Sequence, residues 1–161
     1  MDLRRSGRVL AAGALGAALA LSPTAAQAVP AAPPDLAAHR VADGTAHGAV
    51  AWFRQHAGDA SYEGYCETAV ERAYGTSGVW PSANAHWQAA LDTGAAHPGH
   101  RNPPPGAFVF WNSGEWGHVG VADGAGGFHS TSIGGAIGHA AGLDHFAGYL
   151  GWSDPAVPAR P

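Results

Sequence analysis

The segment GAFVFWNSGEWGHVGVADGAGGFHSTS, residues 106–132, decides the fold class of this chain. Short runs of valine and aromatic residues alternate in it with glycine-rich stretches, a pattern typical of short strands joined by tight turns. Two further runs of this kind follow it before residue 154. The pattern predicts strands at 106–111, 117–123, 126–132, 134–140 and 146–153.

The residues that precede this segment have helical periodicity instead. We expect helices at about 47–57, 63–74 and 81–94, the second ended by Gly75 and the third begun by Ser82 as its N-cap. The proline-rich stretch that follows the third helix, up to Pro105, predicts no regular structure. Helices first and strands second predict an α+β domain, with N-terminal helices packed on a C-terminal antiparallel β-sheet.

The N-terminus has the three-part layout of a secretory signal peptide. Arginines at 4, 5 and 8 precede an apolar run from Val9 to Leu21, and the small-x-small tripeptide Ala26-Gln27-Ala28 follows. The run is shorter than the ~20 residues of a membrane span. We therefore expect cleavage after Ala28, a secreted, extracellular and cell-wall-associated protein, and no stable membrane insertion. The predicted organisation is a signal peptide at 1–28, a linker and N-terminal segment at 29–46, one domain at 47–153 and a tail at 154–161.

Removal of 28 residues from 161 leaves 133, which is enough for one domain with its own core. This part has five arginines, no lysine and eleven acidic residues, so its net charge is about −6 with neutral histidines. Such a balance disfavours a nucleic-acid-binding surface.

Cys66 is the only cysteine of the chain. In an exported protein a single cysteine indicates an intermolecular disulfide, a reactive thiol or a buried inert thiol. Its place at the start of the second predicted helix favours a reactive thiol, because a helix N-terminus and a nearby imidazolium lower a thiol pKa. The imidazole has to come from elsewhere in the fold.

Two histidines of the predicted strands are the candidates for that imidazole. If Asp123-Gly124 forms a two-residue hairpin turn, His118 faces His129, so that one can act as base and the other can orient it. If the turn centres on Ala125, His118 faces Ser132 instead. The third residue of the site is therefore open between His129 and Ser132.

GYCETAVERAYG, PPPGAFVFW, GHVGVADG and GGFHSTS together resemble the NlpC-like cell-wall cysteine peptidases, a papain-like superfamily with CHAP amidases as cousins. HPGHRNPPPGAFVFW and YLGWSDP are also similar to catalytic domains of actinobacterial phage lysins. The resemblance covers roughly residues 47–152. It implies a papain-like core, and a hydrolase (thiol protease) in which Cys66 is the nucleophile, His118 the base and His129 the third catalytic residue.

The same resemblance implies a substrate and a chemistry. The implied partner is the peptidoglycan stem peptide, cleaved at an amide involving D-glutamate or a diamino acid, by a monomer that needs no metal or cofactor. Amidase, endopeptidase and transpeptidase activities remain open. The sequence departs from the family pattern at Tyr65, where an aspartate is usual, at Glu67, where a serine is usual, and at Ala107, where an aspartate is usual. The lysin-like relatives also have an aspartate where this chain has Ser132, and this departure favours His129 over Ser132 as the orienting residue.

Two other classes of function compete with this interpretation. The altered neighbours of Cys66 are compatible with a catalytically inert wall-binding module that has kept the fold. Ten histidines suggest a metal-binding exported protein, although they lack the paired spacing on one helix that zinc sites such as H-E-x-x-H show.

Overall fold

A computed structural model describes residues 42–158. The predicted signal peptide, its cleavage site and most of the predicted linker lie outside the described residues. Within residues 42–158 no helix is both long and apolar enough to cross a membrane.

The three predicted helices are confirmed. They are α2 (Ala46–Gln55), α3 (Cys66–Ala73) and α4 (Ala83–Thr93), and two short 3-10 helices lie at Ala60–Tyr62 and Leu143–His145. Helix α4 begins as predicted, because the Ser82 hydroxyl accepts a hydrogen bond from the Ala85 N–H. Helix α3 begins at Cys66 rather than near residue 63, since Gly64 adopts a φ of 78° and turns the chain there.

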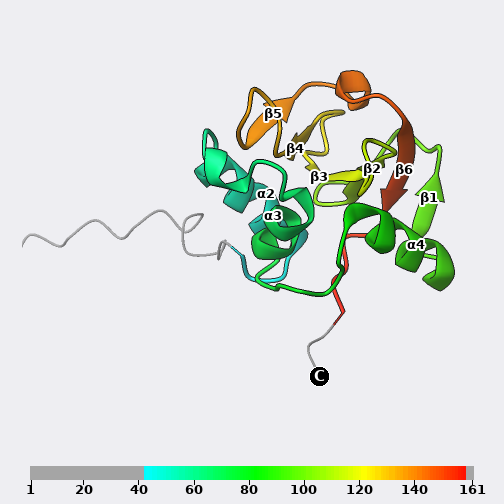
Figure 1. Cartoon of the computed structure of the whole chain (residues 1–161). Helices are drawn as coiled ribbons and strands as arrows, with labels where there is room; N and C mark the ends of the chain where they lie inside the picture. Colours follow the sequence, from blue (N-terminus) through cyan, green and yellow to red (C-terminus); the bar gives the residue numbers. More distant parts are fainter. Residues whose placement is uncertain (1–41, 159–161) are drawn as a thin grey trace, which may run out of the picture. The chain divides into compact units, whose positions relative to one another are not determined.

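The strands form one six-stranded antiparallel sheet in the order β1-β6-β2-β3-β4-β5 (Figure 1). All five predicted strands are present, each shorter than expected: β2 (Phe108–Trp111), β3 (His118–Ala122), β4 (Phe128–Ser130), β5 (Gly138–Ala140) and β6 (Tyr149–Ser153). Strand β1 (Ala96–Pro98) lies in the stretch predicted to be irregular, and for these residues that prediction was wrong. Among residues 42–158 it pairs with β6 alone, and such an edge position tolerates its proline.

The hairpin register between β3 and β4 differs from the one expected for a two-residue turn at Asp123-Gly124. Val121 pairs with His129 and Ala122 with Phe128, which is the register of a turn centred on Ala125. The Asp123 carboxylate accepts hydrogen bonds from the N–H groups of Ala125 and Gly127, at 2.7 and 3.0 Å. These bonds stabilise a loop longer than the two-residue turn we had favoured, so the prediction that His118 faces His129 was wrong.

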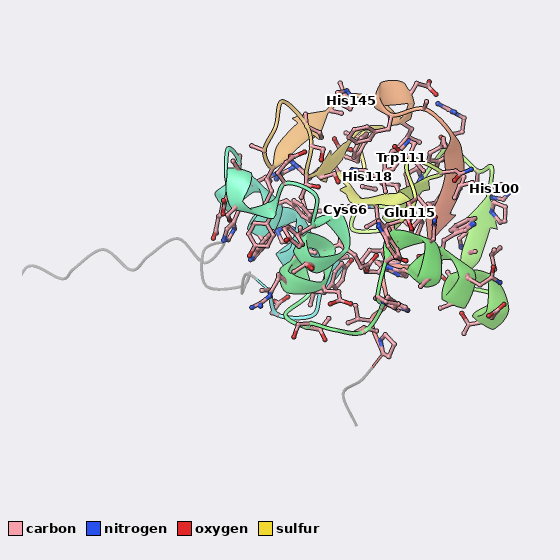
Figure 2. All side chains as sticks on the ribbon, viewed as in Figure 1. Cys66, His100, Trp111, Glu115, His118 and His145 are labelled. Carbon is pink, nitrogen blue, oxygen red and sulfur yellow. The ribbon has the colours of Figure 1, made fainter. Side chains whose placement is uncertain are left out.

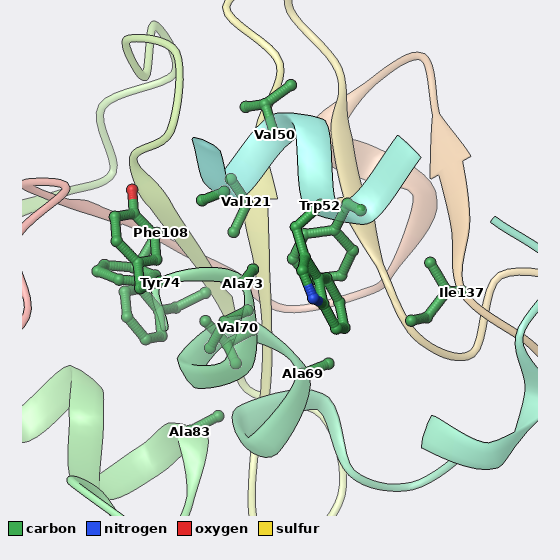
Figure 3. Packing of buried hydrophobic residues seen from close by; sticks show 14 residues of the cluster. Val50, Trp52, Ala69, Val70, Ala73, Tyr74, Ala83, Phe108, Val121 and Ile137 are labelled. Atoms are coloured by element: carbon green, nitrogen blue, oxygen red, sulfur yellow. The ribbon is translucent and has the colours of Figure 1, made fainter. Parts of the chain in front are cut away.

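The main core lies between the helices and one face of the sheet (Figure 3). Helix α3 packs on β3, α2 packs on β4, and α4 packs on β1 and β3. A second apolar cluster, which includes Val109, Trp111 and Phe128, covers the other face. The domain is α+β with its helices N-terminal to an antiparallel sheet, as the sequence predicts, and α3 meets the sheet where β3 begins.

Candidate active site

Cys66 is the first residue of α3, and it lines a cleft of about 400 Å³. Figure 2 shows Cys66 with His118 and Glu115, and all three side chains line this cleft. The backbone N–H groups that interact with the thiol belong to Cys66 itself, Glu67 and Val119. Because Val119 follows His118 directly, this contact brings the thiol to the start of β3. The structure therefore places the predicted nucleophile and the predicted base in one cleft.

Ser130, on β4, is the polar partner of His118. The Ser130 hydroxyl donates to the carbonyl oxygen of Val119 at 2.6 Å, and its oxygen lies 2.9 Å from Nε2 of His118. A hydroxyl has only one proton, so Ser130 must accept its second bond from an Nε2–H. This fixes the neutral tautomer of His118 and leaves Nδ1 unprotonated, as a base requires.

Packing also holds the His118 ring. Its centroid lies 4.3 Å from that of Phe146 and 6.0 Å from that of Trp111. His118 is 9 % exposed, and Ser130 is fully buried. The ring is therefore restrained by two aromatic neighbours and one hydrogen bond.

The electrostatics of the pair differ from the sequence-based expectation. Burial raises the pKa of the Cys66 thiol and outweighs the three N–H groups that lower it. Burial likewise lowers the pKa of His118 to about 4, against the opposing effect of Glu63. At neutral pH the free protein therefore holds a neutral thiol beside a neutral imidazole, and not the thiolate–imidazolium pair that we expected.

His129 does not contact His118. It pairs with Val121 and lies on the helix-facing side of β4, where its ring stacks near Phe53 and lies 4.8 Å from the His139 ring. Its Nε2 is buried and has no hydrogen-bond partner within residues 42–158. Sequence reasoning chose His129 through the wrong hairpin register, so the geometry does not support it as the orienting residue.

Ser132, the alternative third residue, also turns away from His118. Its φ of 59° ends the extended run of β4, and its hydroxyl donates to Glu63 at 2.7 Å. Ser130 was missed because the sequence analysis compared only residues directly opposite His118. The signal that could have found it is a small hydroxyl residue two positions before the register partner, Ser132.

Glu67 forms part of the cleft wall beside Cys66. Its Oε1 lies 3.0 Å from Nδ1 of His86, which is 2 % exposed. Glu67 is buried, because His86 of helix α4 lies against it.

Two exposed aromatic side chains line the same cleft. Tyr65 is 63 % exposed and Trp116 is 65 % exposed. Tyr62 instead packs edge-on against Trp52, so Tyr65 is the tyrosine that lies at the cleft. Large exposed aromatic groups beside a polar cleft suit contacts with the apolar parts of a ligand.

Comparison of the sequence with protein-family models and with curated proteins gave no match. Among the described residues, no group of three or more histidine, cysteine or acidic side chains is placed to hold a metal ion.

Proposed function

We propose that this protein is a secreted cysteine hydrolase that cleaves amide bonds in peptidoglycan stem peptides. One observation supports the proposal most strongly: Cys66 and His118 line the same cleft. Cys66 lies at a helix N-terminus, and Ser130 holds the His118 ring by a hydrogen bond. A nucleophile, a base and a group that orients the base are the parts that covalent acyl transfer needs. The papain-like core and the peptidoglycan substrate come from the motif resemblance.

The first chemical step begins with the thiol protonated. Nδ1 of His118 removes the thiol proton as Sγ of Cys66 attacks the amide carbon, and an oxyanion forms on the carbonyl oxygen. The N–H of Cys66, at the N-terminus of α3, is available to stabilise this oxyanion. The imidazolium then protonates the leaving amine, and a thioester remains on Cys66.

In the second step water releases the acid. His118, again neutral, takes a proton from water as the water oxygen attacks the thioester carbon, and returns that proton to the departing thiolate. Ser130 keeps Nε2–H occupied throughout, so that the reactive nitrogen is always Nδ1. We therefore propose a Cys66–His118–Ser130 site in place of the Cys66–His118–His129 site expected from sequence.

Digestion of purified peptidoglycan, followed by mass analysis of the released muropeptides, tests the proposal. The parent protein should release stem-peptide fragments, whose masses identify the bond that is cleaved. Cys66→Ala and His118→Ala should each reduce release by at least about 100-fold, because each removes a reacting group. Both variants are checked for folding by circular dichroism.

One outcome separates the proposal from the inert wall-binding alternative. If the folded parent protein binds cell walls but releases nothing, and alkylation of Cys66 leaves wall binding unchanged, the hydrolase proposal is wrong. Loss of release on addition of a chelator, with no effect of alkylation, would favour a metal-binding protein instead.

A further inference from the structure

Glu67, a residue of the cleft wall, has a buried carboxyl oxygen that lacks a partner among the described residues. Glu67 directly follows Cys66, lines the cleft and is 7 % exposed. Its Oε2 has no hydrogen-bond partner within residues 42–158. A buried carboxyl oxygen without a partner is costly, so such an atom beside a reacting group indicates a binding contact.

The Glu67 carboxyl group is held rigidly. Oε1 bonds to Nδ1 of His86 at 3.0 Å. The His86 ring is in turn stacked on Trp80, with centroids 3.5 Å apart, and lies edge-on to Phe108 and Phe110. With Oε1 and the ring fixed, Oε2 is preorganised for an incoming group.

The charges of the cleft favour a cation. Of its two carboxyl groups, Glu67 is buried and Glu115 is exposed, so that solvent screens the charge of Glu115. None of the described residues that line the cleft is an arginine or a lysine. Burial raises the pKa of Glu67, which opposes ionisation of the empty site. A bound ammonium would favour the carboxylate and offset that burial, whereas a substrate carboxylate would be repelled.

We propose that Glu67 binds a protonated amino group of the substrate through Oε2, and so selects peptides with a free amine beside the cleaved amide. This inference rests on the proposed function, because it places the amine next to the carbonyl that Cys66 attacks. Since Cys66 and Glu67 are consecutive, the amine belongs to a residue that flanks the cleaved bond. It is either a peptide α-amine or the side-chain amine of a diamino acid.

A binding experiment tests this without requiring turnover. The Cys66→Ala protein is titrated by calorimetry with a tripeptide of L-alanine, D-glutamate and L-lysine in four forms. These are the free peptide, the peptide acetylated on the α-amine, that acetylated on the side-chain amine, and the doubly acetylated peptide. Acetylation of one amine should weaken binding by at least about 10-fold, because a charge-assisted hydrogen bond is lost, and the sensitive amine identifies the source.

Glu67→Gln, in the same Cys66→Ala background, removes the charge but keeps an oxygen that can accept from His86. The factor by which acetylation weakens binding, the acetylation penalty, should fall below about 3-fold in this variant, since a neutral amide has no preference for a cation. Glu115→Gln is the matched control, because Glu115 lines the same cleft but is exposed. It should leave the penalty within about 2-fold of the parent value.

The outcomes separate this inference from the proposed function. If acetylation of neither amine affects binding to the protein with Glu67 intact, or if Glu115→Gln abolishes the penalty as completely as Glu67→Gln, the inference is wrong. If the amine preference is present but the parent protein cleaves no peptidoglycan, the hydrolase proposal fails while the binding role of Glu67 stands.

Discussion

At the residue scale, the hydroxyl of Ser130 is the contact that the sequence did not reveal. Ser130→Ala should leave Nε2–H of His118 buried without an acceptor and free the ring to rotate. We expect muropeptide release to fall by about 10- to 100-fold, the effect of losing one buried hydrogen bond. Ser130→Thr keeps the hydroxyl and should recover part of the loss.

Ser132→Ala is the matched control for this change, because it removes a hydroxyl that bonds to Glu63 and not to His118. Its muropeptide release should stay within about 3-fold of the parent. A larger loss in Ser132→Ala than in Ser130→Ala would contradict the assignment of Ser130.

The alkylation rate of Cys66 near pH 6 should be low, whereas the sequence predicts a reactive thiol. Burial raises the pKa of Cys66 and lowers that of His118 to about 4, so both groups are neutral near pH 6. Iodoacetamide should therefore label Cys66 more slowly than a free cysteine standard at pH 6, and the rate should rise at higher pH than for the standard. Mass spectrometry of timed samples measures both rates, and rapid labelling at pH 6 would indicate a preformed thiolate.

At the scale of the elements, Glu71 connects helix α3 to the loop before α4. Its buried carboxylate accepts hydrogen bonds from the N–H groups of Gly78, Val79 and Trp80, the last two at 2.8 Å. Trp80 stacks on His86, and His86 bonds to Glu67 in the wall of the cleft. The Glu71 carboxylate therefore also supports that wall.

Glu71→Gln should lower the free energy of unfolding by about 2–4 kcal/mol, since a neutral amide replaces a charged acceptor that serves three donors. Urea denaturation measures the change. Asp92→Asn, an exposed carboxylate on α4, should change stability by less than about 0.5 kcal/mol. If the two changes lowered the free energy of unfolding equally, the hydrogen bonds of Glu71 would contribute no more to stability than an exposed carboxylate does.

At the scale of the whole molecule, two of the buried histidines, His118 and His129, should make stability depend on pH. Burial lowers the pKa of both His118 and His129 to about 4, against 6.5 for an unhindered imidazole. Between these values each of the two histidines binds more protons in the unfolded chain than in the folded one, so the stability that depends on them should be complete above pH 6.5 and decrease as pH falls towards 4. Each histidine contributes a slope of at most ~1.4 kcal/mol per pH unit.

The comparison of urea midpoints at pH 4.5 and 7 checks this expectation. His129→Gln should flatten the dependence, because it removes one of these two histidines. An unchanged slope in His129→Gln would mean that His129 is protonated as easily in the folded protein as in the unfolded chain.

Local signals in the sequence determined the elements and the fold class. Hydrophobic periodicity, the Ser82 cap and glycine-bounded runs depend on neighbouring residues, so three helices, five of the six described strands and the helical position of Cys66 could be predicted. The α+β class followed from their order along the chain.

Only the tertiary structure decided the partners within the site. The hairpin register depends on the Asp123 carboxylate, which determines that His118 bonds to Ser130 and that His129 packs by Phe53. The burial of Glu67 depends on His86 of α4, which lies 19 residues further along the chain and bonds to it. The pKa directions of Cys66 and His118 likewise come from desolvation by the assembled core, a quantity that no local pattern contains.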